Sequence, residues 1–141
     1  MRFVLDNSVV MRWLLRDGSE ERLAYANKAL ELLELQAGEA VVPGIWALEA
    51  ANVIVKAQAK ALVTEARATA FIGLLNDMRI SVDPRTAERA LGETLQLARR
   101  FKLSSYDASY LELALREGLP LATLDVALRE AMLQTGGALV E

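Results

Sequence analysis

The sequence has 141 residues, of which 53% are hydrophobic, and its 16 Lys and Arg against 19 Asp and Glu give a net charge of -3. This length predicts a single domain, residues 1–141, with a sizeable core. The chain has neither Cys nor His, which excludes disulfides, thiol nucleophiles, structural zinc sites and Ser-His-Asp triads. Catalysis would therefore depend mainly on carboxylates, and binding of nucleic acid would require a local basic patch or bound metal ions.

The sequence shows no pattern typical of a signal peptide or of a membrane-spanning helix. Only three apolar residues separate Arg2 from Asp6, which is too short for a signal peptide. The most apolar window, residues 40–55, contains Glu49 and is shorter than the roughly 20 residues that a membrane span needs. We therefore expect a cytoplasmic protein that makes no membrane contact.

Short apolar runs bounded by turn residues alternate with longer helical patterns along the chain. The predicted strands are residues 3–5, 40–42, 79–82 and 119–123, with a terminal edge strand at 138–140. The predicted helices are residues 9–16, 19–37, 43–60, 64–77, 83–100, 104–117 and 125–134. This alternation predicts an α/β fold with a mainly parallel sheet of four to five short strands, covered on both faces by about seven helices.

The helical periodicity also predicts burial. Helix 43–60 is apolar on most of its circumference and should be largely buried. Helix 83–100 should begin at an Asp83 N-cap followed by Pro84. The residues expected to face inward from helices 64–77 and 83–100 are Ala68, Phe71, Ile72, Leu75, Met78, Ala87, Leu91, Leu95 and Ala98. The aromatic residues expected in the core, rather than as platforms for bases, are Trp13, Trp46 and Tyr106.

Two acids occupy equivalent places in this pattern. Asp6 directly follows the first predicted strand, and Asp125 follows the last long one. In open α/β sheets, ligands bind at the carboxyl edge of the strands, so these two side chains could meet in one crevice. The alternative for each is an N-cap of the next helix, a common role for Asp.

A third acid, Asp107, lies near the start of a predicted helix. It shares a helix face with Leu111 and Ala114, so its carboxylate would need a partner or an ion if that face is buried. The alternative is a capping box in which Ser104 is the cap and Asp107 stands three residues further on.

A fourth acid, Glu49, lies within helix 43–60. Glu49 and Asn52 are the only polar side chains between Pro43 and Val55, and their spacing of three puts them on one face. This polar seam faces either a site or water, in the second case as part of a narrow solvated stripe that continues to Lys56.

The four acids form an oxygen-only set of the kind that binds hard ions such as Mg²⁺ or Mn²⁺. Without an ion they would repel one another, and some would take up protons. A metal held by carboxylates suits phosphodiester hydrolysis by an activated water and needs no His. The residues placed to hydrogen-bond the acids are Ser8, Asn52 and Thr123. The basic residues that could contact phosphates are Arg12, Arg16, Arg99, Arg100 and Lys102, although Arg99 and Arg100 could instead complement a helix dipole.

The order of four short motifs resembles that of PIN-domain ribonucleases. The motifs are Val4-Leu5-Asp6-Asn7-Ser8, Leu48-Glu49-Ala50-Ala51-Asn52-Val53, Tyr106-Asp107-Ala108-Ser109-Tyr110-Leu111 and Thr123-Leu124-Asp125. Within this family the chain resembles the VapC toxins of toxin-antitoxin pairs, and the resemblance spans essentially its whole length.

This resemblance implies a three-layer PIN-like fold and a metal-dependent endoribonuclease. In such proteins the acids that match Asp6, Glu49, Asp107 and Asp125 are catalytic and bind Mg²⁺ or Mn²⁺, and residues that match Ser8, Asn52 and Thr123 support them. The resemblance also implies a homodimer, a VapB-type antitoxin that lies along the groove, and a structured RNA substrate such as tRNA or rRNA.

Two other readings remain open at this point. A PIN-like domain could bind RNA or a partner without cleaving. A receiver-type phosphoacceptor domain also has an acidic Mg²⁺ pocket, but it usually has adjacent acids after its first strand and a late Lys. Here Asn7 follows Asp6, and no Lys lies beyond Lys102.

Overall fold

The computed structural model describes residues 1–141 and contains one parallel four-stranded sheet with the order β3-β2-β1-β4. The strands are Arg2–Leu5 (β1), Glu39–Val42 (β2), Ile80–Val82 (β3) and Leu121–Ala122 (β4). In the register, Phe3 pairs with Ala40 and Leu5 pairs with Ala122. The edge strand predicted at 138–140 is reduced to one isolated bridge between Leu121 and Leu139.

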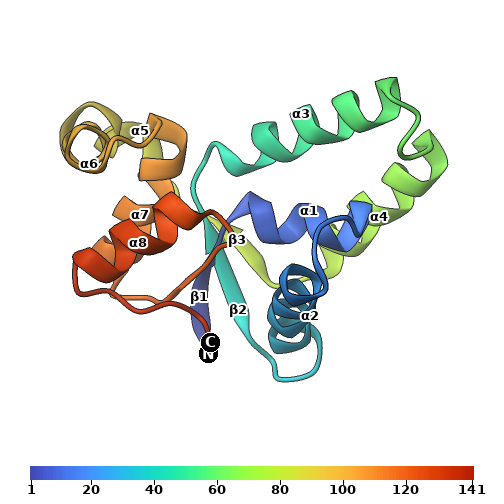
Figure 1. Ribbon diagram of the computed structural model, residues 1–141, viewed down its shortest axis with the longest axis horizontal. Helices are drawn as coiled ribbons and strands as arrows, with labels where there is room; N and C mark the ends of the chain where they lie inside the picture. The colour runs from blue at the N-terminus through green and yellow to red at the C-terminus, as the bar shows by residue number, and fades with distance from the viewer.

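Helices cover both faces of the sheet, as Figure 1 shows. The helices of one side are Asn7–Leu15 (α1), Glu20–Glu34 (α2), Trp46–Ala59 (α3) and Glu65–Asp77 (α4). Those of the other side are Thr86–Arg89 (α5), Ala90–Thr94 (η1), Leu95–Phe101 (α6), Ser105–Glu117 (α7) and Val126–Gln134 (α8). Because α5, η1 and α6 form one kinked run, seven helices flank the sheet, and the predicted three-layer α/β fold is confirmed.

Alternation along the strands divides the core between the two faces. Phe3 and Leu5 belong to a cluster of 22 buried residues that α1, α2, α3 and α4 complete. Val4 and Val41 point to the opposite face and join a cluster of 11 buried residues from α7, α8 and the chain's last residues. Both faces of the inner strands β1 and β2 are therefore buried, as expected for a parallel sheet between two helical layers, whereas the edge strand β3 is largely exposed.

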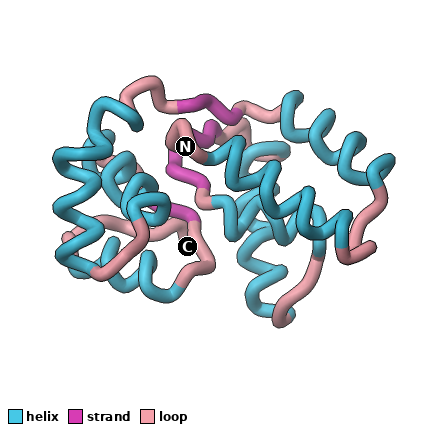
Figure 2. Tube along the Cα trace, turned by 90° about the horizontal axis from the view of Figure 1, so that it is seen from above, coloured by secondary structure: helices cyan, strands magenta, loops and turns pink.

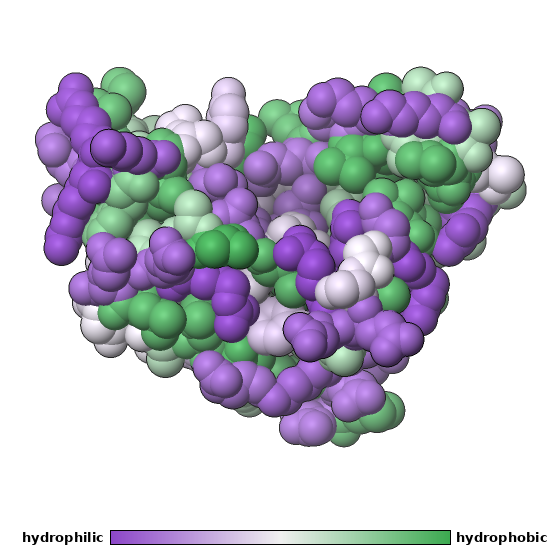
Figure 3. All heavy atoms as spheres, in the orientation of Figure 1, coloured by the Kyte–Doolittle hydropathy of each residue, from purple (hydrophilic) through white to green (hydrophobic).

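The carboxyl ends of the strands lie at the edge of the sheet where α1 and α3 begin, opposite the two chain termini (Figure 1). The trace seen from above shows the strands between the two groups of helices (Figure 2). The space-filling view shows a depression at this edge, between α3 and the α5–α6 run (Figure 3). This edge is the place where the sequence predicts a ligand site.

The predicted burial is wrong on two helices. Leu91 is 88% exposed, because Gly92 has non-helical dihedral angles (φ -108°, ψ -106°) and interrupts the periodicity of the predicted helix 83–100. On α3, Leu48 and Val55 are exposed, so this helix is buried only along one stripe. Ile72 of α4 is also exposed, whereas Phe71 is buried. Apolar side chains are accordingly visible on the part of the surface that α3 and α4 form (Figure 3).

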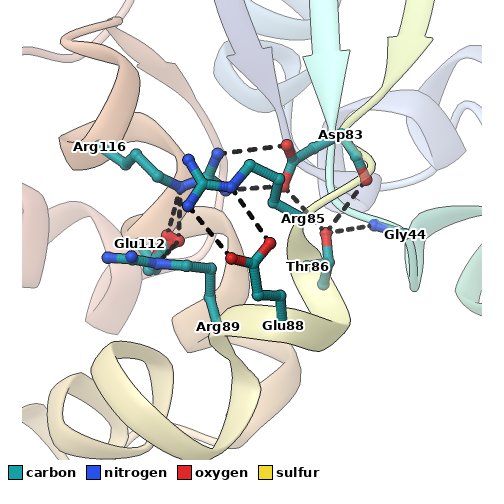
Figure 4. A network of polar contacts seen from close by, with 8 residues as sticks. All are labelled: Gly44, Asp83, Arg85, Thr86, Glu88, Arg89, Glu112 and Arg116. Atoms are coloured by element: carbon teal, nitrogen blue, oxygen red, sulfur yellow. Dashed lines mark hydrogen bonds and ion pairs between the residues drawn. The ribbon is translucent and has the colours of Figure 1, made fainter.

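Asp83 does not cap a helix, contrary to the prediction. The helix begins later, with Arg85 at the N-cap position and no side-chain cap. The Asp83 carboxylate instead accepts hydrogen bonds from Arg116 at 2.6 and 3.2 Å and from the Thr86 hydroxyl at 3.2 Å. Arg116 also contacts Glu112 of the same helix at 2.7 Å (Figure 4). A buried ion pair with a distant residue thus replaces the local cap.

The same cluster joins three parts of the chain. The Gly44 N–H, just before α3, donates to the Thr86 hydroxyl at 2.8 Å, and Thr86 contacts Asp83 at the end of β3 (Figure 4). Through Arg116 the cluster reaches α7. It therefore fixes the start of α3 relative to α7, the two helices that carry Glu49 and Asp107.

No helix of the chain combines the length and apolarity that a membrane crossing requires.

Candidate active site

Asp6 lies at the carboxyl edge of the sheet and is 5% exposed. Since Leu5 pairs with Ala122 in the parallel register, the residues that follow them, Asp6 and Thr123, are neighbours. The Thr123 hydroxyl donates to Asp6 Oδ2 at 2.7 Å, and the Ser8 hydroxyl donates to the same oxygen at 2.7 Å. These two hydroxyls hold the carboxylate in one orientation.

The alternative role of Asp6, a side-chain N-cap, is not observed. Asp6 occupies the N-cap position of α1, but its carboxylate accepts no capping hydrogen bond. Desolvation by burial raises the pKa of Asp6 to about 6, the Ser8 and Thr123 hydroxyls oppose this shift, and the charges of Asp107 and Glu49 add to it. This buried carboxylate is therefore disfavoured in its charged form and would be stabilised by a cation.

Glu49 extends from α3 and is held by a side chain that the sequence did not point out. The hydroxyl of Tyr110, on α7, donates to Glu49 Oε1 at 2.7 Å. Tyr110 is fully buried, and desolvation together with the nearby charges of Asp6 and Glu49 raises its pKa, so it stays a neutral donor. Desolvation also raises the pKa of Glu49. The charge of Asp107 adds to this shift, and the hydrogen bond from Tyr110 opposes it.

Asp107 and Asp125 form the other half of the acidic set. Desolvation raises the pKa of Asp107, and the charge of Asp125 raises it further. Ser104 caps α7 by accepting from the Asp107 N–H at 3.1 Å, as the capping alternative predicts. The Asp125 carboxylate accepts from the Leu128 N–H at 2.8 Å and caps α8, so its alternative role as a cap is also realised.

Electrostatic repulsion links the four acids in a chain. The charges of Asp107 and Glu49 raise the pKa of Asp6, the charge of Asp107 raises that of Glu49, and the charge of Asp125 raises that of Asp107. None of the chain's ion pairs involves any of these acids. In their present rotamers, no three of the acids converge into a ready-made metal-holding group.

The chemistry of the donors nevertheless fits a hard divalent ion. All four side chains offer carboxylate oxygens, the ligands that Mg²⁺ and Mn²⁺ prefer. The carboxylate of Asp6 is buried without a cationic partner, and such a charge is stable only when it is compensated. Asp6, Glu49 and Asp107 are the residues that would hold the ion, with Asp125 beside Asp107.

A hollow of about 420 Å³ opens next to Glu49. Asn7, Asn52, Leu48 and Tyr106 contribute to its walls. Asn52 is exposed there, and its side chain makes no hydrogen bond to Glu49. Asn7 is 8% exposed, and its Oδ1 atom is buried without a partner.

None of the basic residues suggested by the sequence forms an ion pair with one of the four acids. Arg12 pairs with Asp17, and Arg16 ends α1 in the left-handed conformation. Arg100 stacks on the ring of Phe101 at 4.7 Å. Arg99 and Lys102 are exposed at the end of α6. All of these side chains other than Arg12 are exposed and accessible to a polyanion.

Two arginines that the sequence analysis missed lie closer to the carboxyl end of β4. Arg129 donates to the Thr123 carbonyl at 2.8 Å, and Arg22 donates to the Leu124 carbonyl at 3.4 Å. The spacing of four between Asp125 and Arg129 on one helix was the available signal. Only the fold brings Arg22 to the same place.

A parallel α/β domain with repelling carboxylates at its sheet edge fits a site for a divalent metal ion. A model of the PIN domain family matches residues 3–132, and the chain belongs to this family. PIN domains are generally metal-dependent nucleases that act on RNA, which excludes the receiver-type alternative.

A comparison of structures gives the same fold. The crystal structure of PAE2754 from Pyrobaculum aerophilum is similar, with a TM-score of 0.65 and 24% sequence identity. The similarity covers 93% of this chain and 79% of that one. No curated protein matches the sequence.

Proposed function

We propose that the protein is a Mg²⁺- or Mn²⁺-dependent endoribonuclease of the VapC type, the toxin of a toxin-antitoxin pair. The observation that carries the proposal is the environment of Asp6, a buried carboxylate with two hydroxyl donors, two repelling acids and no cation. Such an environment is costly for folding unless it serves a site.

The chain's residues divide the work of the site. Asp6 would hold a divalent ion, and Ser8 and Thr123 fix the orientation of its carboxylate. Glu49 and Asp107 complete the set of ligands, and Tyr110 orients Glu49 by its hydrogen bond. Asp125 adds negative charge beside Asp107 while it caps α8.

When bound, the divalent ion supplies the positive charge that activates a water and stabilises the leaving oxygen of the phosphodiester. The acidic hollow would otherwise repel the phosphate backbone. Exposed basic side chains would compensate in part, and we assign phosphate contacts to Arg16, Arg99, Arg100 and Lys102. Arg12 contributes once it exchanges Asp17 for a phosphate.

The exposed apolar surface supports the partners that a VapC-type protein needs. Leu48, Val55 and Leu62 are each more than 60% exposed on and just after α3. Isolated apolar side chains are common on surfaces, but a stripe along one helix indicates a contact with another chain. We propose that this surface serves a homodimer and a VapB-type antitoxin in the cytoplasm, with the antitoxin reaching the hollow beside Glu49.

The test is cleavage of structured RNA by the purified protein with Mn²⁺, with Mg²⁺ and with EDTA. Discrete fragments should appear with either metal and disappear with EDTA. Asp6→Asn keeps the shape of the side chain but removes a charged ligand, so it should lower the cleavage rate at least about 100-fold. Asp77→Asn, at the exposed end of α4, is the matched control and should cleave like the wild type.

Two results would count against this function. Cleavage that survives both EDTA and Asp6→Asn would assign the activity to another site or to a contaminant. Intact RNA under every condition, together with tight RNA binding, would favour a PIN-like module that binds without cleaving.

A further inference from the structure

A second hollow lies beside the acidic one. Its volume is about 350 Å³, and it is lined by the start of α3, the α5–η1 run and the first turns of α7. Its walls include Ile45, Thr86, Ala90, Thr94 and Ser105, together with Tyr106. None of the residues that line it is charged.

Tyr106 connects the two hollows. The sequence predicted that this residue belongs to the core, but its side chain is 57% exposed. Tyr106 and Ile45 line both the uncharged hollow and the hollow that contains Glu49. Because Tyr106 and Glu49 line the same hollow, a group in contact with the Tyr106 ring lies next to the acidic set.

The chemistry of the walls selects among possible occupants. A phosphate would find no cation there. The hydroxyls of Thr94 and Ser105 line the hollow, and an aliphatic side chain would leave them without partners, whereas the Thr86 hydroxyl is already bonded to Gly44 and Asp83. A flat, uncharged group with polar edges can contact the Tyr106 ring and use the hydroxyls.

We propose that this hollow is a base subsite that receives one unpaired nucleobase of the RNA, adjacent to the phosphate that is cut. The base stacks on Tyr106 and forms hydrogen bonds with the hydroxyls of Ser105 and Thr94. The subsite selects the position of the cut in a single-stranded loop. The inference rests on the proposed endoribonuclease function, because the position of the subsite is defined relative to the acids.

The test uses the RNA fragment that the wild-type protein cleaves, with an abasic nucleotide placed in turn at each position flanking the cut. At one position the loss of the base should lower kcat/KM by about 5- to 100-fold, the range expected for stacking of one base. Tyr106→Ala should lower kcat/KM on the intact RNA by a similar factor and should be insensitive to the abasic substitution. Tyr106→Phe keeps the ring and should keep the sensitivity.

A second pair of variants separates occupation of the hollow from general damage. Ala90→Leu places a larger side chain in the hollow, so it should also remove the sensitivity to the abasic nucleotide. Ala70→Leu makes the same change on the exposed side of α4, and this variant should remain sensitive to the abasic nucleotide. If no flanking position shows a sensitivity that depends on Tyr106 and Ala90, the hollow is not a base subsite, and a side chain of a protein partner becomes its better occupant.

Binding without cleavage distinguishes failure of this inference from failure of the proposed function. In Asp6→Asn, RNA with 2-aminopurine at the sensitive position should be quenched on binding, and Asp6→Asn combined with Tyr106→Ala should leave it unquenched. If no RNA is cleaved, a scan of 2-aminopurine positions in a loop RNA replaces the cleavage assay. Quenching that depends on Tyr106 would then support the subsite and reject the nuclease, whereas quenching at no position would overturn the subsite.

Discussion

The hydroxyl of Tyr110 donates a hydrogen bond of 2.7 Å to Glu49 across 61 residues of sequence. It joins α7, which carries Asp107, to α3, which carries Glu49. Because Tyr110 is fully buried, its hydroxyl has a fixed position and defines where the Glu49 carboxylate lies. Tyr110 is therefore a positioning residue for the acidic site.

Tyr110→Phe should reduce cleavage while it preserves the fold. The substitution removes only the hydroxyl, and a hydrogen bond to a charged group is worth about 1.5–3 kcal/mol, or roughly 10- to 100-fold in kcat/KM. Loss of this donor should also raise the pKa of Glu49 further and move the acidic limb of the pH–rate profile upward. The control is Tyr25→Phe, which removes the hydrogen bond from the Tyr25 hydroxyl to the Val140 carbonyl, a bond that involves none of the acids. Equal rates for the two variants would rule out this role.

Asp6 should make the metal-free protein less stable as the pH rises. Its pKa of about 6 in the folded state exceeds the ordinary value of 3.8, so the folded chain binds the proton more tightly than the unfolded chain. This contribution is fully present below about pH 4 and is lost as the pH rises through about 6, a change of about 3 kcal/mol at most. Asp6→Asn lacks it.

The measurement is urea unfolding of both proteins in EDTA across this pH range. The variant should gain stability relative to the wild type as the pH rises, and the difference should level off at neutral pH. A constant difference in stability from pH 4 to pH 8 would mean that the pKa of Asp6 is not raised in the folded protein.

The affinity for metal should rise with pH as Asp6 loses its proton, whereas the stability of the metal-free protein falls. The ion displaces the proton from Asp6, so the affinity for Mn²⁺ should fall by about tenfold per pH unit below about pH 6 and level off above it. Calorimetry at several pH values measures this slope. An affinity that is flat between pH 5 and pH 7 would exclude Asp6 as a ligand.

Arg116 should be the most important ion-pairing residue for stability. Its side chain contacts two buried acids, Asp83 at 2.6 Å and Glu112 at 2.7 Å. Arg116→Met leaves both acids without this partner, and removal of one member of a buried pair costs about 3–5 kcal/mol. Thermal unfolding should show a large loss for Arg116→Met and almost none for Arg85→Met, whose partner Glu88 is exposed.

Asp83 itself should make the fold sensitive to acid. Desolvation acts to raise its pKa, but the hydrogen bonds and charge of Arg116 outweigh this, and the pKa of Asp83 lies below its ordinary value. Such a carboxylate contributes stability above the ordinary pKa of 3.8, and this contribution is lost as the pH falls through the lower folded-state pKa. Asp83→Asn should therefore lose much of the wild type's dependence on pH below about pH 4, which urea unfolding can measure.

Features that depend on local sequence were predicted correctly. The strands predicted at 3–5 and 119–123 were identified from short apolar runs and breakers and correspond to β1 and the shorter β4. Their parallel pairing brings Asp6 and Thr123 together. Ser104 was recognised as a cap because the signal lies within four residues. The family of the chain was also recognised from such short motifs.

Features that depend on distant partners were missed. Asp83 looks like a helix cap in the sequence, but Arg116, 33 residues away, competes successfully for its carboxylate. Leu91 fits a helical stripe that the irregular backbone at Gly92 interrupts. Tyr106 and Tyr110 are four residues apart in one motif, yet one is exposed and the other is fully buried. Tyr106, in the first turn of α7, lines the hollow beside Glu49, whereas Tyr110, one turn further along, belongs to the core cluster.

Mn²⁺ titration by calorimetry at about pH 7.5 measures whether Asp6, Glu49 and Asp107 bind one divalent ion as a unit. The wild type and the Asp77→Asn control should bind with the same affinity. Asp6→Asn and Asp107→Asn should each weaken binding at least about tenfold, since each removes a ligand. Equal Mn²⁺ affinity in Asp6→Asn and the wild type would show that Asp6 is not a metal ligand.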